Sequence, residues 1–348
     1  MNCSKVIASI AICCLALSLP EAASSKKRPK PDFQIKFATL APDGSTWMKT
    51  MRAIDDEVRA KTENRLGFKF YPGGVQGDEK DVLRKIRSGQ LHAGGFTGFG
   101  LGALVPEVRV LELPFMFESL DELDQLRVET DEHFFDAFDA KGFTNLGWVD
   151  VGFVYIYSKS PVKSPAEMKN AKMWAWSGDP LAEMFFRAFS VSPIPLSAPD
   201  VLTSLQTGII DAVYGSPLAV VALQWYTRVK YMSDVPVTHA LGAAIVSKKA
   251  LRKVSAADIQ ILREIAAPRL RELTLKTREQ NIEAVAELKK EGIEVITISD
   301  AARDDFFTRG RAAWSDGVGR LYSRELLERI QASLDAHRNG VGRASTKR

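Results

Sequence analysis

Histidine and cysteine, two residue types that often hold metals or attack substrates, are sparse in this sequence. None of the four histidines has a second histidine or a cysteine three to five residues away: His92, His133, His239 and His337. The three cysteines all lie in the first fourteen residues: Cys3, Cys13 and Cys14. No nucleophile elbow or Ser-His-Asp spacing is visible. We therefore expect no metal site, no cysteine chemistry and no enzyme.

An acidic cluster, Asp78-Glu79 with Asp81, is a candidate carboxylate pair for acid/base work. The cluster also stands where a helix is predicted to begin. Acidic side chains in the first turn offset the positive end of the helix dipole. The sequence favours this structural role over the catalytic one.

The glycine-rich segment 94–103 contains a formal G-x-G-x-x-A match at Gly98, Gly100 and Ala103. A dinucleotide fingerprint needs a helix directly after it, and Pro106 would break that helix before two turns. We expect a tightly packed loop that lines a crevice, with no nucleotide and no other cofactor.

Aromatic side chains are concentrated in the second half of the chain. Trp174 and Trp176 are two residues apart on a predicted strand, so both indoles point to the same side, and Met173 and Ala175 to the other. The other aromatic residues of this region are Phe153, Tyr155, Tyr157, Tyr214, Trp225 and Tyr226. Some belong to the core, and we expect at least one indole to line a ligand crevice, because it combines apolar area with one donor.

Composition and charge limit the class of protein. The chain has 348 residues, of which 45% are hydrophobic and 26% charged, which excludes a disordered, collagen-like or coiled-coil polypeptide and fits two domains or one large α/β unit. The net charge of +4 comes from basic segments near the two ends, because residues 31–337 hold 38 basic residues against 42 acidic ones. A mildly acidic body argues against a nucleic-acid partner.

The N-terminal segment has the layout of a secretory signal peptide. Lys5 precedes the apolar run Val6–Leu19, and Pro20 and small residues follow. Fourteen apolar residues are too few for the roughly 20 that span a bilayer, so a membrane anchor is disfavoured. We expect residues 1–24 to be removed, with cleavage near Ala23 or Ser24, and a periplasmic mature protein that does not span the membrane.

Two runs of alternating strands and helices follow. The first comprises a strand at 33–37, a helix capped by Ser45, a strand at 68–70, a helix from Asp78 and a strand at 92–96. The second comprises strands at 153–157, 173–176 and 209–214, with helices at 180–189, 197–208 and from Ser216 through Tyr226. This order predicts parallel sheets covered by helices, with a ligand crevice between two α/β halves.

The last part of the chain is predicted to be mostly helical. Gly242–Ser247 forms a strand that returns to the first sheet, and a helical pattern runs from Ser255 to Gly292. Pro268 should kink this helix. At 1.5 Å per residue it would reach roughly 50 Å, enough to lie across both halves.

Five segments together form a specific pattern: Lys36–Pro42, Tyr71–Glu79, Leu111–Phe117, Pro180-Leu181 and Leu205–Val213. Over residues 33–300 the chain resembles the dicarboxylate-binding type of extracytoplasmic solute-binding proteins from tripartite ATP-independent periplasmic (TRAP) transporters. The resemblance implies an α/β, two-domain periplasmic solute-binding fold with crossing strands, a long kinked helix spanning both domains and hinge closure on the ligand. The expected bounds are 32–150 plus 239–280 for domain I, 151–238 plus 281–335 for domain II, and 336–348 for a basic tail.

The resemblance also indicates where the ligand chemistry departs from the family. An arginine that pairs with the ligand carboxylate would stand at Trp174, and a further arginine at Val154. A family asparagine corresponds to Gly215, beside Ser216, which could donate a hydrogen bond. Lys172 or Arg187 could supply the missing charge as an alternative.

The leading hypothesis is a periplasmic receptor that captures a small organic ligand, partly hydrophobic or aromatic, and delivers it to TRAP-type membrane subunits. A monocarboxylate is one candidate for this ligand. The alternative is a periplasmic carrier for a hydrophobic ligand in an efflux or lipid-handling system. We expect ligand contacts from Thr39, Ser45, Trp47, Thr97, Phe153, Tyr155, Trp174, Trp176, Tyr214, Ser216 and Trp225.

Overall fold

The computed structural model describes residues 29–345, and the predicted signal segment lies outside them. We call residues 33–112 lobe 1 and residues 159–233 lobe 2. Lobe 1 contains β1 (Phe33–Ala38), α1 (Thr46–Lys61), β2 (Leu66–Tyr71), α2 (Glu79–Arg87), β3 (Ala93–Thr97), α3 (Gly98–Gly102) and the 3-10 helix η1 (Pro106–Glu112). Lobe 2 contains α5 (Pro165–Asn170), β5 (Trp174–Trp176), α6 (Pro180–Ala188), β6 (Ile194–Leu196), η2 (Ala198–Asp200), α7 (Val201–Thr207), β7 (Ala212–Gly215), α8 (Pro217–Ala222), η3 (Trp225–Arg228) and β8 (Tyr231–Ser233).

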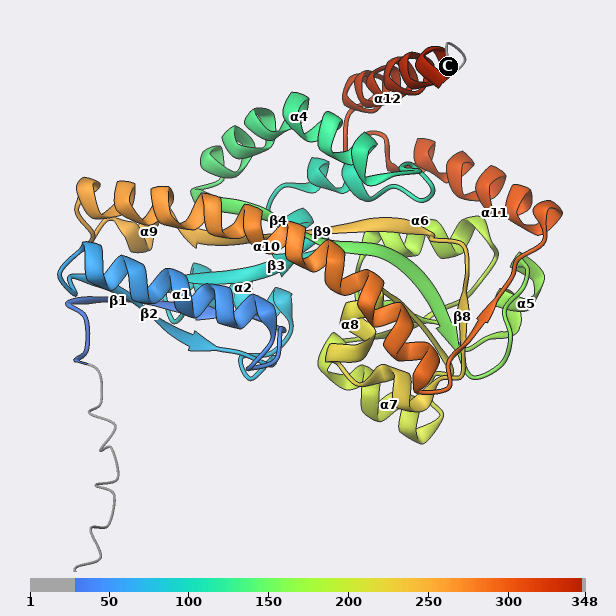
Figure 1. Cartoon of the computed structure of the whole chain (residues 1–348), viewed down its shortest axis with the longest axis horizontal. Coiled ribbons are helices and arrows are strands. Elements are labelled where there is room, and N and C mark those ends of the chain that lie inside the picture. Colours follow the sequence, from blue (N-terminus) through green and yellow to red (C-terminus); the bar gives the residue numbers. More distant parts are fainter. Residues whose placement is uncertain (1–28, 346–348) are drawn as a thin grey trace, which may run out of the picture. The chain divides into compact units, whose positions relative to one another are not determined.

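The remaining elements connect the lobes or follow them (Figure 1). Between the lobes in sequence come α4 (Leu120–Ala140) and β4 (Phe143–Ser158). After lobe 2 come β9 (Thr238–Ser247), α9 (Lys248–Leu251), α10 (Ala256–Lys290), β10 (Glu294–Ile296), α11 (Asp300–Ala312), η4 (Ala313–Gly317) and α12 (Arg324–Ser345).

Within the described residues, eight strands form one mixed, curled sheet in the order β10-β8-β4-β9-β3-β1-β2, with β7 also paired to β4. β1 is parallel to β2 and β3, as the strand-helix-strand order of lobe 1 predicts. β9 is antiparallel to both β3 and β4, so the expected return of this strand to the first sheet is confirmed. A separate pair, β5 with β6, is parallel.

Strands β4 and β9 tie the sheet together from one lobe to the other. They pair in antiparallel fashion from Phe143 opposite Ser247 to Val154 opposite Thr238. The far end of β4 then pairs with β7 and β8 of lobe 2, while β9 pairs with β3 of lobe 1. The segment predicted as a short strand at 153–157 is therefore the end of one 16-residue strand.

The predicted helix starts of lobe 1 are correct. The Ser45 hydroxyl accepts a hydrogen bond from the backbone N–H of Met48 and caps α1. Asp78 and Asp81 form a capping box at the start of α2. The apolar stripe of α1 packs fully buried against the sheet through Met51, Ile54 and Val58.

The long helix α10 has 35 residues and continues through Pro268, which lies inside it. It packs against α1 of lobe 1, then β4, then α8 of lobe 2 (Figure 1). The prediction of one helix that contacts both lobes is therefore confirmed.

Two local predictions were wrong. The helix that begins after Ser216 ends at Ala222, because Gln224 adopts a left-handed conformation (φ 59°), and Trp225 begins η3 instead. The segment after residue 335 is not a solvated tail throughout, because α12 extends to Ser345. The Arg338 guanidinium there lies 2.8 Å from the Glu122 carboxylate and also donates to the Met116 carbonyl.

Asn281 on α10 connects three elements at the centre of the molecule. Its Nδ2 donates to the Val151 carbonyl of β4, and its Oδ1 accepts from the Leu218 N–H in the first turn of α8, both at 3.0 Å. It packs where β4 bulges at Gly152, whose φ of 118° and lack of a Cβ leave room for the amide.

We expect Asn281→Ala to lower the free energy of unfolding by about 1–3 kcal/mol, because it leaves the Leu218 N–H and the Val151 carbonyl without their partner. Urea unfolding followed by circular dichroism measures the change. Glu283→Ala, on the exposed side of the same helix, is the control. Equal stability of the two variants would contradict this role for Asn281.

Candidate functional site

A cavity of about 480 Å³ lies between the lobes and is walled by both of them. Lobe 1 contributes α1, β3 and η1 to the wall, lobe 2 contributes β5, α6, β7 and α8, and β4, β9 and α10 complete it. Most of the wall is aromatic or aliphatic. A concave, mostly apolar space with few polar groups is the usual form of a small-molecule site.

Nine of the eleven predicted ligand residues line this cavity: Thr39, Ser45, Trp47, Thr97, Trp174, Trp176, Tyr214, Ser216 and Trp225. Phe153 and Tyr155 are not among the lining residues. Successive residues of a strand face opposite sides, and in this part of β4 the residues that line the cavity are Val154 and Ile156. On the other side of the bulge at Gly152, Val149, Asp150 and Val151 line it as well. Phe153 instead packs edge-on against His239, with ring centroids 5.2 Å apart.

Trp174, predicted at the position of the family arginine, is a fixed part of the wall. Its side chain is 1% exposed, and its Nε1 donates to the Leu196 carbonyl at 3.1 Å. Its ring stacks on Tyr214 at 4.9 Å and meets Trp225 edge-on at 5.3 Å. It therefore offers a ligand an apolar face and no spare donor.

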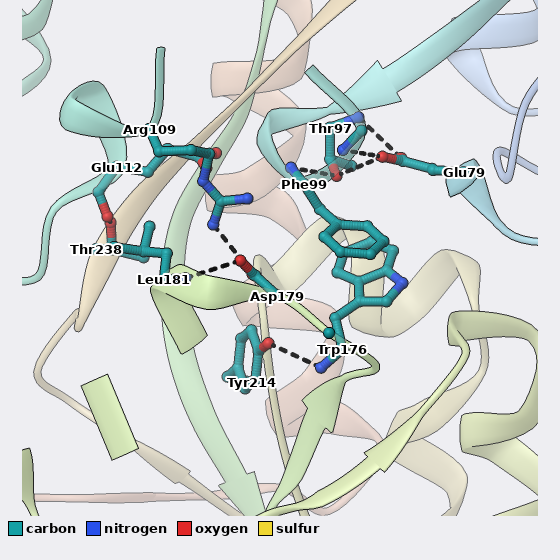
Figure 2. A network of polar contacts seen from close by, with 12 residues as sticks. Glu79, Thr97, Phe99, Arg109, Glu112, Trp176, Asp179, Leu181, Tyr214 and Thr238 are labelled. Carbon is teal, nitrogen blue, oxygen red and sulfur yellow. Dashed lines mark hydrogen bonds and ion pairs between the residues drawn. The ribbon is translucent and has the colours of Figure 1, made fainter. Parts of the chain in front are cut away.

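Trp176 joins the two lobes at the cavity. Its Nε1 donates to Asp78 Oδ2 at 2.7 Å. Its ring stacks on Phe99 of lobe 1 at 4.8 Å (Figure 2). Asp78 also accepts from the Ala198 N–H at 3.2 Å. The same carboxylate thus caps α2 in lobe 1 and holds two groups of lobe 2.

Glu79 begins α2, as the sequence predicted, and it is also a buried residue of the cavity wall. Its carboxylate accepts from the Thr97 N–H at 2.8 Å, the Gly100 N–H at 2.7 Å and the Thr97 hydroxyl at 3.1 Å (Figure 2). Burial raises the pKa of Glu79 to about 8, although these donors lower it. The glycine at 100 leaves space for this carboxylate, since a Cβ there would collide with it.

A buried ion cluster crosses from lobe 1 to lobe 2. Arg109 Nη2 lies 3.0 Å from Asp179 Oδ2, and Arg109 Nε lies 3.1 Å from Glu112 Oε2 (Figure 2). All three side chains are at most 7% exposed. Burial lowers the pKa of Arg109, but the attraction of Asp179 and Glu112 outweighs it and the net pKa is raised. Burial raises the pKa of Glu112, against the effect of Arg109.

A second charge network is centred on Asp150 of β4, which also lines the cavity. Asp150 is fully buried, and it pairs with Arg127 at 3.1 Å and with Arg278 of α10 at 2.6 Å. His239 lies close to this network with no hydrogen-bond partner among the described residues. Burial lowers the pKa of His239 to about 4, so its imidazole is neutral at pH 7.

The sequence carried only weak signals for these buried charges. Arg109 and Glu112 are three residues apart in the otherwise apolar segment 108–117. Two charged residues in such a segment are unusual and could have indicated a buried ion pair. Asp179 precedes Pro180, which is a typical position for a helix cap. It does cap α6, because it accepts a hydrogen bond from the Leu181 N–H. Their contact joins residues 70 apart in the chain, a pairing that spacing does not reveal.

The glycine-rich segment lines the cavity through Gly95, Thr97 and Phe99. Its fingerprint glycines leave room for carboxylates: a Cβ at Gly98 would collide with Glu112, as one at Gly100 would with Glu79. Acidic groups at these positions would repel a phosphate. Among residues 29–345, no group of three or more His, Cys, Asp or Glu is arranged to hold a metal ion.

The raised pKa of Glu79 predicts a pH dependence of stability. A carboxyl whose pKa rises from 4.5 to about 8 on folding stabilises the fold fully below about pH 4.5, and that contribution is lost as pH rises toward 8. We expect the free energy of unfolding to fall less steeply between pH 5 and pH 8 in Glu79→Gln than in the wild type. Urea unfolding at several pH values measures both slopes, with exposed Glu183→Gln as the control. Parallel profiles would contradict the shifted pKa.

A family model for bacterial extracellular solute-binding proteins, family 7 (DctP), matches residues 37–319. The C4-dicarboxylate-binding periplasmic protein DctP of Rhodobacter capsulatus is 25% identical over 331 residues, which is 92% of this chain and 92% of that protein. Across the described part of this chain, no helix has the length and apolar character needed to cross a bilayer.

Solved structures agree in fold. A TRAP periplasmic solute-binding protein from Xanthobacter autotrophicus Py2 with bound β-D-galacturonate superposes with a TM-score of 0.80 at 21% identity, covering 86% of this chain and 99% of that one. A Bordetella pertussis extracytoplasmic solute receptor that binds pyroglutamic acid gives 0.79 at 21% identity, covering 87% and 99%. The chain therefore belongs to family 7 of the bacterial extracellular solute-binding proteins, the DctP family.

Proposed function

We propose that this protein is a periplasmic receptor that captures a small, partly hydrophobic or aromatic organic solute between its lobes and presents it to TRAP-type membrane subunits. The observation that carries the proposal is the cavity of about 480 Å³, walled by both lobes and dominated by apolar side chains. Family membership supports the receptor role, and the lining residues support the class of solute.

The known ligands of similar proteins are organic acids, which this cavity is less suited to hold. The Xanthobacter protein binds galacturonate, the Bordetella receptor binds pyroglutamic acid, and the Rhodobacter protein binds C4-dicarboxylates. In this chain Trp174 and Val154 replace the arginines that the family pattern would supply, and both line the cavity. Neither proposed substitute reaches it, because Lys172 binds the Gly208 carbonyl and Arg187 is exposed.

Closure of the lobes is the step that would trap the solute. In this structure the lobes meet at the cavity rim through the Trp176–Asp78 hydrogen bond and the Trp176–Phe99 stack. Lys80 of lobe 1 adds a hydrogen bond to the Gly178 carbonyl of lobe 2 at 2.9 Å. We infer that these contacts form on closure and break on release, while β4, β9 and α10 keep the lobes joined.

We expect Trp176→Phe to weaken solute binding by about ten- to a hundredfold, because it removes a hydrogen bond to a carboxylate worth roughly 1.5–3 kcal/mol but keeps an aromatic ring for Phe99. Calorimetry with the solute recovered from the protein measures the loss. Trp148→Phe is the matched control, since Trp148 is buried away from the cavity and its Nε1 has no partner among the described residues. Unchanged affinity in Trp176→Phe would argue against this latch.

Native mass spectrometry of protein purified from its own host tests the receptor function directly. We expect a bound small molecule of a size that fits about 480 Å³, lost on denaturation. Small-angle scattering should then show a smaller radius of gyration when that molecule is returned to the emptied protein. A protein that retains and rebinds no small molecule would refute the receptor role.

A further inference from the structure

We propose that the cavity selects an uncharged solute and excludes carboxylates. The reason is that Arg109, the basic side chain in the cavity wall, is already paired with two acidic side chains of the protein. This inference rests on the receptor function proposed above and narrows the class of solute. It concerns Arg109, Asp179 and Glu112, three side chains that the sequence pattern did not mark.

The cavity wall holds one basic side chain and several acidic ones. Arg109 is the one lysine or arginine among the described residues that line it. Four carboxylic acids line it as well: Glu79, Glu112, Asp150 and Asp179. Asp150 is paired with Arg127 and Arg278, and the raised pKa of Glu79, about 8, keeps most of that carboxyl uncharged at pH 7. A carboxylate solute entering this space would therefore find a single cation beside Glu112 and Asp179, where a cleft for anions would present an unpaired cation.

Arg109 is already paired on two sides. Asp179 lies 3.0 Å from its Nη2, and Glu112 lies 3.1 Å from its Nε. The cluster of one guanidinium and two carboxylates leaves no positive charge to balance a third carboxylate. Because the groups are buried, water would screen little of the repulsion between that carboxylate and the two acids.

The two acids are held in place independently of Arg109. Asp179 Oδ1 accepts from the Leu181 N–H at 3.0 Å and caps α6. Glu112 Oε1 accepts from the Leu241 N–H at 3.0 Å, and the glycine at position 98 leaves the space for its carboxylate. If either acid moved away from Arg109 to free it for an anionic solute, a backbone N–H inside the protein would lose its hydrogen-bond partner, which is costly.

Two other lining residues hold polar atoms that suit a neutral solute. Trp47 Nε1, a donor, and Gln280 Oε1, an acceptor, are both buried and without a hydrogen-bond partner among the described residues. The absence of a side chain at Gly95 of β3 allows the Trp47 indole to pack closely there, since a Cβ at that position would collide with it. A solute with a hydroxyl or primary amide group, which both accepts and donates, could satisfy both kinds of atom without carrying a charge.

The test uses pairs of probes that differ mainly in charge: benzamide with benzoate, and octanamide with octanoate. Binding to the full mature protein is followed by calorimetry and by tryptophan emission. We expect the wild type to bind the amide of each pair at least about tenfold more tightly than the acid. The solute recovered by native mass spectrometry should also carry no carboxyl group when it is treated with a carboxyl-specific reagent.

Asp179→Ser tests the cause. Serine is a favoured helix cap, so α6 keeps its first hydrogen bond while Arg109 loses one of its two carboxylates. We expect affinity for benzoate to rise about tenfold and affinity for benzamide to change little. Glu183→Gln, exposed on the same helix, removes one acidic charge outside the cavity and should leave the preference for amides intact. If Asp179→Ser does not fold, Glu112→Gln replaces it, because its amide oxygen can still accept from Leu241.

The outcomes separate the two proposals. A wild-type protein that binds an acid as tightly as its amide, or that retains a carboxylic acid, remains a receptor but overturns the exclusion of anions. An Asp179→Ser variant that folds without gaining affinity for benzoate overturns the role of Asp179. A protein that binds no probe and retains no solute refutes the receptor function itself, and the selectivity proposal with it.

Discussion

The antiparallel pairing of β4 with β9 is the interaction on which the rest of the structure depends. β9 joins β4 to β3 of lobe 1, and β4 continues into lobe 2, where it pairs with β7 and β8 of the same sheet. The helix α10 packs along β4. The register shifts near Gly147 and Gly152, where positive φ angles bend β4. Because residues from both strands line the cavity, their register decides which side chains a solute meets.

The cavity is surrounded by polar groups that are mostly satisfied by the protein itself. Glu79 holds three donors of the glycine-rich segment, Asp78 holds Trp176, and Asp179 holds both Arg109 and the start of α6. Such internal pairing keeps buried charge tolerable and leaves an apolar interior. The wall is therefore shaped by charged groups, yet it offers a solute mainly apolar surface.

Under the proposed selectivity, the same internal pairing would let the family fold take a different class of solute. An arginine on a strand would need a partner in the empty cleft, and a ligand carboxylate supplies it in proteins that bind acids. In this chain the strand position holds Trp174, and the arginine that does reach the cavity, Arg109, has acidic partners within the protein. On this proposal, the class of solute depends on whether the carboxylates that pair with the arginine belong to the ligand or to the protein, while the backbone fold stays the same.

The sequence by itself determined the family, several helix starts and the apolar face of α1, because caps, apolar stripes and turn glycines act over a few residues. Ser45, Asp78 and the stripe Met51–Ile54–Val58 were predictable for that reason. Only the tertiary structure decided which face of β4 meets the cavity, placing Val154 and Ile156 there and turning Phe153 and Tyr155 away. The contact between Arg109 and Asp179 also depends on the tertiary structure, since the energy of a buried charge depends on partners that the fold brings from distant parts of the chain.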